Sequence, residues 1–553
     1  MKELQTYLLL MDNLNLPEKC VLVIDDFANV RKSIKTQLQD LGVRQVVEAY
    51  DSTSASKALK DYQFDLILCD FNLGKGKDGS RLLEEWRLTN AIRQETIFVL
   101  ITAETSRDMV VSAMEYQPDD YLAKPFSMDV FSNRIVRWFE KRNVFLPLLN
   151  SVEEGDWPIV TQQARLIMEQ YPRHRAAAQR YYAQSLVKQG ILTEAENFLR
   201  GLVDKRYLSW AQAEIHRIDM LQENYQVAEK GLKNVLIRDP NLTEAYDLLA
   251  EVLKKLNKTE DLQKWLEVAV NRAPKNIKRQ ETLAEVAQGN EDYYRSSVAY
   301  RDIMNMSSDT IHENVGVYQK YLNSLHQEEI TTDSEQRKRD IHREMASASR
   351  RMTDRYQSDP SARLYAKAMA LMEQENLRST LHEKQLNKLL ISALESIDRV
   401  NGETAIICTQ VMYRAERLSE GDELVERFRS RFAEQPDILE RLQALQAEPA
   451  SQEKRQKATD LNLKGVECYK NKEFTESIVY FQEAMQLSPR HPGIILNFVQ
   501  SHLVEMRTDK VNIQKVELCL EYLNRLVYLP EDHYQYERYR KLTKTLKKMK
   551  QGK

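Results

Sequence analysis

Short apolar runs alternate with stretches of helical spacing over residues 19–142, and this alternation constrains the fold more than any other feature of the sequence. The apolar runs, which we predict to be strands, are residues 21–24, 45–49, 66–69, 97–102 and 120–123. The stretches with helical spacing are residues 28–41, 52–62, 79–89, 106–116 and 128–141. Because five βα units follow one another, we expect a parallel sheet with helices on both faces and right-handed crossovers.

Carboxylates gather at the carboxyl ends of two predicted strands. Asp25 and Asp26 end the first apolar run, and Asp70 ends the third. Open α/β sheets place their chemistry at this edge. Three carboxylates there repel one another unless a cation lies between them, and oxygen ligands with open positions suit Mg²⁺. We therefore predict that Asp70 is phosphorylated beside a magnesium site. The alternative is a row of carboxylates that only solvates the edge of the sheet.

Two further residues complete a recognisable set, since Thr102 ends the fourth predicted strand and Lys124, followed by Pro125, ends the fifth. With the three aspartates, in this order, they resemble the receiver domain of bacterial two-component response regulators. The resemblance covers the whole N-terminal domain and implies a flavodoxin-like fold. It implies that Asp70 takes a phosphoryl group from a histidine kinase or phosphotransfer protein. It also implies that the domain catalyses only its own phosphorylation and dephosphorylation.

The same resemblance implies a ligand set for Mg²⁺. Asp26 and Asp70 would bind the ion directly, and Asp25 would act mostly through water. The backbone carbonyl of Asn72 would complete the set.

General chemistry agrees with these roles. An aspartyl phosphate forms by in-line attack, so the protein needs mainly to position the reactants and neutralise charge. Lys124 can reach a phosphoryl oxygen and Thr102 can donate a hydroxyl hydrogen bond. The Lys124–Pro125 bond is a candidate for the cis form, which X–Pro bonds tolerate.

Three more positions follow from the resemblance. Asn72 and Glu104 occupy positions that tune phosphoryl hydrolysis in this family, and the pair is similar to that of chemotaxis receivers, which implies a short-lived signal. The loop after Asp70 is rich in glycine and lacks the proline often found there, which leaves its conformation open. Tyr121 stands where receivers carry a switching aromatic; the alternative is plain core packing.

After Lys141 the alternation stops and helical spacing continues almost to the end. Pro240 and Pro274 lie 34 residues apart, as do Ala228 and Leu262. This period, with small residues at helix crossings, resembles tetratricopeptide (TPR) repeats. Stacked helix pairs of this kind form a superhelix with a concave face that suits peptides or helices.

The sequence thus predicts an α/β receiver followed by an all-α helical-repeat superhelix. The expected parts are a lead-in helix (1–18), the receiver (19–142), TPR-like repeats (143–306), degenerate helical repeats (307–445) and a C-terminal TPR unit with terminal helices (458–553). Residues 446–457 contain Pro449 and several charges, which favours a flexible linker.

Composition excludes several function classes. The formal net charge is −3, which argues against a general nucleic-acid binder. The five cysteines are widely spaced and form no CxxC pair, so they indicate reduced thiols in a cytoplasmic protein. The apolar run at residues 7–11 is too short to span a membrane, and we expect no membrane association.

These features leave three functional hypotheses. In the first, phosphorylation of Asp70 controls binding of a protein target by the repeats, possible targets being a histidine kinase or another response regulator. The coupling would run through the helix at 128–141 into the helices after Asn143. In the second, Asp70 is a phosphate sink and the repeats are a scaffold. In the third and weakest, basic residues between Arg337 and Arg355 bind nucleic acid; acidic neighbours there favour a solvated helix face instead.

Overall fold

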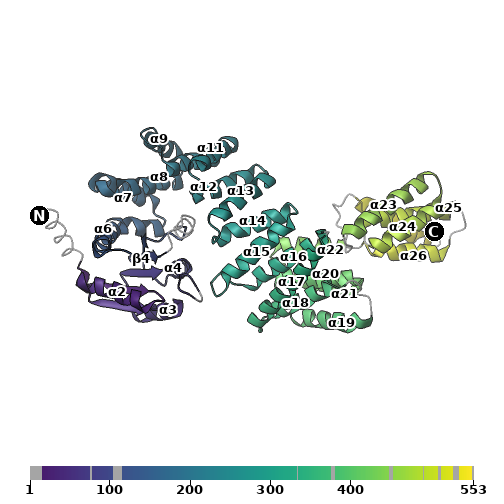
Figure 1. Cartoon of the computed structure of the whole chain (residues 1–553). Helices are drawn as coiled ribbons and strands as arrows, with labels where there is room; N and C mark the ends of the chain where they lie inside the picture. The colour runs from purple at the N-terminus through teal and green to yellow at the C-terminus, as the bar shows by residue number, and fades with distance from the viewer. Residues whose placement is uncertain are drawn as a thin grey trace. The chain divides into compact units, whose positions relative to one another are not determined.

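The computed structural model divides into two compact units, residues 1–333 and 334–553 (Figure 1). The residues that it describes are 15–74, 77–103, 115–332, 334–374, 380–447, 452–489, 491–508, 512–526 and 535–550.

A five-stranded parallel sheet opens the first unit and confirms the predicted fold class. Its strands are β1 (Cys20–Ile24), β2 (Gln45–Ala49), β3 (Leu66–Asp70), β4 (Ile97–Thr102) and β5 (Asp120–Ala123), in the order β2-β1-β3-β4-β5. Every neighbouring pair is parallel. The strand order reverses direction between β1 and β3, and ligands of open α/β sheets bind at such a switch point.

Helices cover both faces of the sheet: α2 (Ala28–Asp40), α3 (Ser52–Asp61), α4 (Gly79–Leu88) and α6 (Met128–Glu153). The alternation of side chains along each strand divides the core into two clusters. One cluster packs Val21 and Leu66 against residues of α2 and α6. The other packs Leu22 and Ile67 against residues of α3 and α4. Because both faces are covered, β1, β3 and β4 are fully buried, which explains why they are apolar up to Asp70 at the end of β3 and Thr102 at the end of β4.

Two predicted helices lie mainly outside the described residues. Of the predicted helix at 106–116, only Glu115 and Tyr116 are described. Of the lead-in helix at 1–18, the described part is Asn15 and a single 3₁₀ turn, η1 (Leu16–Glu18).

The last helix of the α/β domain is longer than predicted. We expected it to end near Lys141, but α6 continues to Glu153 and passes through the expected domain boundary. No glycine or proline interrupts residues 142–146, and the buried side chains of Arg142, Phe145 and Leu148 continue the packing of the helix. Pro147 lies inside the helix, where it removes one backbone hydrogen bond without ending the helix. The expected break between the domains is therefore a continuous helix.

Helices follow α6 one after another to the end of the first unit. They are α7 (Trp157–Gln170), η2 (Pro172–His174), α8 (Arg175–Lys188), α9 (Leu192–Val203), α10 (Ser209–Leu221), α11 (Tyr225–Arg238), α12 (Thr243–Lys255), α13 (Thr259–Arg272), α14 (Ile277–Gly289), α15 (Tyr293–Ser307) and α16 (Val315–Thr331). The helices α8, α10, α12 and α14 begin at 34-residue intervals. Each helix contacts the next one along the chain, as Figure 1 lets the reader follow from α8 to α15. This geometry is consistent with a helical repeat.

The helices described in the second unit are α17 (Glu335–Arg355), α18 (Pro360–Met372), α19 (Thr380–Glu395), η3 (Ile397–Arg399), α20 (Gly402–Arg414), α21 (Leu418–Arg431), α22 (Pro436–Ala447), α23 (Gln452–Lys470), α24 (Phe474–Leu487), α25 (Pro492–Thr508), α26 (Ile513–Asn524) and α27 (Tyr536–Lys550). The predicted linker at 446–457 is too long, because α23 already begins at Gln452. A glycine marks the crossing of α23 and α24: a Cβ on Gly465 would lie 2.7 Å from the Phe481 ring. Within the described residues, every helix is too short or too polar to cross a membrane.

Candidate functional site

Three carboxylates meet at the carboxyl edge of the sheet. One oxygen each of Asp25, Asp26 and Asp70 lies within 4.8 Å of the other two. Asp25 is 1% exposed and Asp70 is 8% exposed, whereas Asp26 faces solvent. Strands β1 and β3 are hydrogen-bonded neighbours, with Ile24 opposite Cys69, so their ends bring the acidic side chains together.

The backbone around Asp25 fixes the direction of its side chain. The Phe27 N–H donates to Asp25 Oδ1 at 2.8 Å, and the Asp25 N–H donates to the Ala49 carbonyl at 3.1 Å. Arg31 reaches back from α2 to the Asp25 carbonyl at 2.6 Å. The turn between β1 and α2 is thus held by its own polar groups.

Lys124 connects the two buried carboxylates. Its Nζ lies 2.6 Å from Asp25 Oδ2 and 2.9 Å from Asp70 Oδ1. The Lys124 N–H donates to the Thr102 carbonyl at 2.7 Å, and the following peptide bond to Pro125 is cis, as the sequence suggested. Burial works to lower the pKa of Lys124, but the hydrogen bonds and charges of Asp25 and Asp70 raise it overall.

Asp70 is harder to ionise than an exposed aspartate. Burial raises the pKa of its carboxyl group, and the charges of Asp25 and Asp26 add to that shift, while Lys124 opposes it. A divalent cation among the three carboxylates would relieve this repulsion. The donors are all hard oxygens, and Asp26 leaves the cluster open to solvent, so the residues present fit Mg²⁺ with several retained waters.

Thr102 and Tyr121 lie on the two strands beyond β3. Thr102 is buried, ends β4 and pairs with Ala123 across the sheet. Tyr121 is half-buried and packs against the core cluster on the α3 and α4 face. This placement agrees with the packing role considered for Tyr121 and leaves its switching role as a prediction.

Of the two residues predicted to tune phosphoryl hydrolysis, Asn72 lies within the described residues and Glu104 does not. Asn72 is exposed, and its side-chain oxygen accepts a hydrogen bond from the Gly74 N–H at 3.2 Å. Gly74 has φ +75°, and a Cβ there would lie 3.6 Å from Asp26 Oδ2, so the loop passes beside the acidic cluster.

Gly79 belongs to the site although the sequence analysis assigned it no role. A Cβ at this position would lie 2.4 Å from the Asp70 carbonyl oxygen and 2.9 Å from Cys69 Sγ. Helix α4 therefore starts directly against the backbone of Asp70, and only glycine permits that approach. The available signal was an Asp-Gly pair, Asp78-Gly79, at the start of a predicted helix soon after Asp70.

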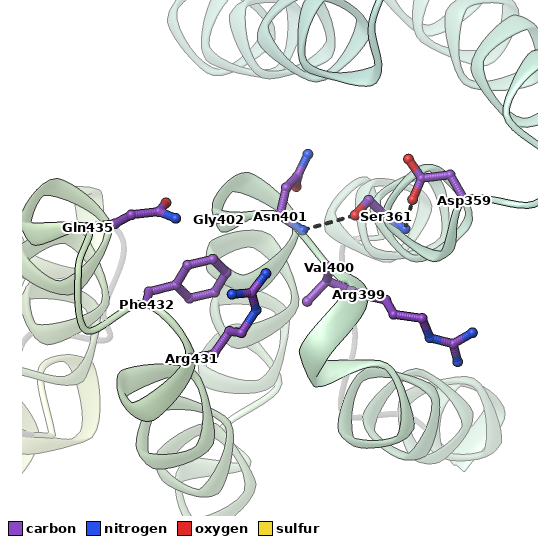
Figure 2. Close-up of a pocket in the computed structure, with 9 residues that line it drawn as sticks. All are labelled: Asp359, Ser361, Arg399, Val400, Asn401, Gly402, Arg431, Phe432 and Gln435. Atoms are coloured by element: carbon purple, nitrogen blue, oxygen red, sulfur yellow. Dashed lines mark hydrogen bonds between the residues drawn. The ribbon is translucent and has the colours of Figure 1, made fainter.

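A separate hollow of about 310 Å³ lies in the second unit. Its nine lining residues come from the starts of α18 and α20 and the end of α21, with their flanking turns (Figure 2). Ser361, buried among them, already accepts a hydrogen bond from the Asn401 N–H at 3.0 Å. Arg399 and Arg431 are exposed. We therefore assign this hollow no ligand.

Comparison with known proteins agrees with the geometry of the acidic site. The sequence model of the response regulator receiver domain matches residues 21–136. Chemotaxis protein CheY of Pseudomonas aeruginosa is 33% identical over 123 residues, which are 22% of this chain and 98% of that protein. CheY-3 of Vibrio cholerae is 31% identical over 121 residues, which are 22% of this chain and 92% of that protein.

The solved structure of Vibrio cholerae CheY4 is 25% identical and covers 22% of this chain and 97% of that one, with a TM-score of 0.20. That score is too low to carry an argument, so the assignment rests on the sequence identity and on the family match. The α/β domain corresponds to nearly the full length of single-domain relatives that share a third of its residues. Through this domain, the chain belongs to the family of two-component response regulators with a receiver domain.

Proposed function

We propose that this protein is a response regulator that is phosphorylated on Asp70 by a histidine kinase or phosphotransfer protein and acts through protein binding by its helical repeats. The observation that carries the proposal is the cluster of Asp25, Asp26 and Asp70 with Lys124 bonded to two of them. A carboxylate held against a lysine and two other carboxylates suits phosphoryl transfer better than a structural role, because an edge that only needed solvation would not bury Asp25 and Asp70.

The chemistry assigns one task to each side chain. A carboxylate oxygen of Asp70 attacks the phosphorus of a phosphohistidine, the O–P bond forms as the P–N bond breaks, and the histidine nitrogen takes up a proton. Lys124, which lies 2.9 Å from Asp70, moves from the carboxylate to a phosphoryl oxygen. Thr102, at the end of the adjacent strand, donates its hydroxyl to a second oxygen.

Asp25, Asp26, Asp70 and the carbonyl of Asn72 are the proposed ligands of Mg²⁺. The bound ion would neutralise part of the charge on the phosphoryl group. Asp25 and Asp26 would hold the ion beside Asp70, and the exposed position of Asp26 leaves this side of the site open to solvent. Asn72 and Glu104 are proposed to set the rate of hydrolysis, and Tyr121 to respond to the movement of Thr102.

The repeats, which follow the continuous helix α6, are proposed to belong to the TPR type. The 34-residue interval between the starts of α8, α10, α12 and α14 supports this assignment, since the TPR period is also 34 residues. Residues 143–306 would then provide the main binding surface and residues 307–445 a less regular extension. We also propose a cytoplasmic location, in keeping with the kinase as phosphodonor. In α17, Arg337 pairs with Glu344 and Arg343 with Asp340, which favours a solvated helix face over a nucleic-acid site.

A small-molecule phosphodonor tests the phosphorylation. Incubation with acetyl phosphate and Mg²⁺ should add the mass of one phosphoryl group to the wild type and none to Asp70→Asn. Asp65→Asn is the matched control, because Asp65 lies just before the amino end of the same strand and pairs with Lys19. Labelling of Asp70→Asn at the wild-type level would overturn the assignment, and a label that persists for hours would contradict the proposed short-lived signal.

The output is tested by capturing partners with and without beryllofluoride and Mg²⁺, a mimic of the aspartyl phosphate. A partner set that changes with the mimic in the wild type, and stays constant in Asp70→Asn, is expected. An unchanged set, with phosphorylation intact, would favour the alternative of a phosphate sink or scaffold.

A further inference from the structure

An arginine that neutral amides alone hold lies among the last helices of the second unit. Arg538, in α27, is half-buried, and burial lowers its pKa while the only opposing charge is that of Tyr469. Its Nε and Nη2 donate to Gln500 Oε1 at 3.1 and 2.6 Å. Nη2 also donates to Asn497 Oδ1 at 2.8 Å. Among the described residues, Arg538 forms no ion pair.

A buried arginine of the first unit shows the usual arrangement. Arg279 of α14 is 3% exposed and donates to Asp247 of α12 at 3.0 and 2.9 Å and to Glu115 of the receiver at 2.8 Å. Beside it, Lys275 lies 2.6 Å from Asp78 of the receiver, and these bonds form the interface between the receiver and the repeats. A charge held away from water is costly unless an opposite charge compensates it. The half-buried arginine of α27 still lacks such an anionic partner.

The amides around Arg538 have a fixed direction. A guanidinium group has no acceptor, so the oxygens of Asn497 and Gln500 must face it and their NH₂ groups must point the other way, towards α23. There Asn497 Nδ2 donates to Asn462 Oδ1 at 3.0 Å. Gln500 Nε2 donates to the Tyr469 hydroxyl at 3.2 Å. These half-buried side chains form one polar row across α27, α25 and α23.

The polar row keeps donors that are not used. An amide nitrogen carries two hydrogens, and the bonds above use one hydrogen each of Asn497 and Gln500. Arg538 Nη1 and Asn462 Nδ2 have no partner among the described residues, and both atoms reach solvent. The acceptors within the row are amide and hydroxyl oxygens and include no carboxylate. The row therefore offers a positive charge and N–H groups to an incoming oxygen ligand.

Lysines extend the positive charge along α27. With about 3.6 residues per turn, Lys541 and Lys548 lie about 60° and 80° from Arg538 around the helix, on the side away from the buried Leu546. A rise of about 1.5 Å per residue places Arg538 and Lys548 about 15 Å apart along the axis. Both lysines are exposed, and Lys541 has only a loose contact of 3.6 Å with Glu537 in its own helix.

The polar row and the lysines fit the side-chain carboxylates of an extended peptide. Side chains on one face of an extended chain repeat about every 6.8 Å, so about three acidic residues at alternate positions cover the distance from Arg538 to Lys548. A guanidinium group and ammonium groups suit carboxylates, and the unused amide N–H groups suit the carbonyl oxygens of the peptide backbone. A single terminal carboxylate would leave the lysines without a partner.

Nucleic acid fits this surface less well. Binding of a single strand without sequence preference uses aromatic rings on which the bases stack. The aromatic ring in the polar row, that of Tyr469, packs edge-on against Phe474 with ring centres 5.4 Å apart, so its own neighbour occupies it. The formal net charge of the chain is −3, which also disfavours a polyanion as long as nucleic acid.

We propose that the polar row and the lysines of α27 form a docking site for an acidic segment of a partner protein, which binds in extended form through its side-chain carboxylates. The site, which we call the α27 site, consists of Asn462, Asn497, Gln500, Arg538, Lys541 and Lys548. This inference goes beyond the proposed function, because Asp70 takes no part in it.

Gln500→Glu tests the α27 site by supplying the missing carboxylate from within the chain. Glutamate has the shape of glutamine, its carboxylate accepts the bonds of Arg538, and the Tyr469 hydroxyl turns to donate. The full-length variant should therefore melt at or above the temperature of the wild type. It should bind a fluorescent peptide of alternating Glu and Ser, with both ends blocked, about tenfold or more weakly than the wild type. Fluorescence anisotropy at low salt measures the binding.

Matched variants control for charge and for folding. Gln482→Glu makes the same change at an exposed position of α24 and should bind as the wild type does. Lys548→Glu should weaken binding about tenfold, whereas Lys547→Glu, about 180° from Arg538 around the helix, should have a smaller effect. Because both lysines are exposed, this pair decides the question if Gln500→Glu fails to fold.

Several outcomes would contradict the proposal. They are a wild type that fails to bind the peptide, and equal binding by Gln500→Glu and Gln482→Glu. A lower melting temperature of Gln500→Glu with unchanged binding would mean that the polar row only holds the helices together. Equally tight binding of a peptide whose one carboxylate is its free C-terminus would assign the site to a chain end instead. Tighter binding of a single-stranded oligonucleotide would assign it to nucleic acid.

The test is separate from that of the proposed function. Asp70→Asn should bind the peptide as tightly as the wild type, since Asp70 lies in the first unit and the α27 site in the second. Failure of Asp70 to accept a phosphoryl group would thus leave the α27 site standing. Loss of peptide binding in Asp70→Asn would instead show that the peptide binds at another place in the chain and would refute the assignment.

Discussion

Where β1 and β3 end, one ammonium group lies against two buried carboxylates. Lys124 bonds to Asp25 and Asp70, and the side chain of Asp25 is only 2% exposed. A buried charge that loses its partner is far more costly than an exposed one, because water cannot replace the lost contact. The geometry therefore gives Lys124 a role in the stability of the unliganded receiver, beside the role proposed for it in phosphoryl transfer.

Replacing Lys124 tests this dual role. Lys124→Met should lower the free energy of unfolding by about 3 kcal/mol in metal-free buffer, since both carboxylates lose their cation. Lys19→Met is the control, because Lys19 pairs with Asp65 at a partly exposed position, and the expected cost is below about 1 kcal/mol. Urea denaturation of both variants measures the difference. Equal losses would show that the Lys124 pairs contribute no more than surface ion pairs.

Replacing Asp70 tests the electrostatic state of the acceptor. Burial raises the pKa of Asp70 above 3.8, so between that value and the raised pKa the folded chain keeps a proton that the unfolded chain has lost. Stability therefore falls as the pH rises through this window and stays lower above it. Asp70→Asn, which carries no charge, should melt at a higher temperature than the wild type in metal-free buffer at pH 7.

Two further measurements, one at lower pH and one with Mg²⁺, check the predicted difference in melting temperature between Asp70→Asn and the wild type. The difference in melting temperature should shrink as the pH falls through this window towards 3.8, because the folded wild type then holds Asp70 protonated and uncharged. Mg²⁺ should also reduce it by stabilising the wild type. A variant that melts below the wild type at pH 7 would mean that the bond to Lys124 outweighs the cost of burying the Asp70 charge.

At the scale of elements, the start of α4 is set by close approach to Asp70. Gly79→Ala places a methyl group 2.4 Å from the Asp70 carbonyl oxygen and should cost about 2 kcal/mol or more. Gly201→Ala is the matched control: apart from adjacent residues and the backbone of α9 itself, no described atom lies within 4 Å of the added Cβ, and alanine there should stabilise by about 0.5–1 kcal/mol. Thermal unfolding of the two variants should shift in opposite directions.

The sequence predicted the strands closely because each is a short apolar run between polar residues. Strands β2, β4 and β5 have the predicted limits, and β1 and β3 differ by one residue each. The end of α6 was missed because nothing in the sequence near Lys141 marks a stop, and Pro147 lies within the helix. The end of the linker was predicted too late, at residue 457. Pro449 and several charges indicated a linker, although helix α23 begins at Gln452.

At the scale of the whole chain, the interface between receiver and repeats could not be predicted. The acidic site could be predicted from the sequence because its residues follow apolar strands, and the carboxyl ends of parallel strands lie at the same edge of the sheet. By contrast, Lys275, Arg279 and Glu115 have no spacing that links them, since 164 residues separate Glu115 from Arg279. Charged residues near helix ends are usually solvated, so only the tertiary structure identifies these as paired.

Because the receiver and the repeats up to α16 belong to one compact unit, the effect of metal binding should extend beyond the sheet. At a Mg²⁺ concentration of 100 times Kd, a single site stabilises the folded state by about 2.7 kcal/mol. Pulse proteolysis in increasing urea, read by mass spectrometry, follows peptides from each part of the chain. Those from β1 to β4 and from α8 to α15 should become resistant together, because contacts such as Arg279–Glu115 couple the two parts.

The second unit supplies the internal control for that experiment. Peptides from α20 to α26 should keep the same midpoint with and without Mg²⁺, since the proposed ligands all lie in the first unit. Arg279→Glu should uncouple the repeats, so that Mg²⁺ protects the sheet but no longer shifts the midpoint of α12 to α15. If the wild-type repeats fail to respond to Mg²⁺ while the sheet does, the contact between receiver and repeats is too weak to transmit a signal from the proposed phosphorylation site. In that case the continuous helix α6, which packs on the sheet and then against α7, is the next connection to test.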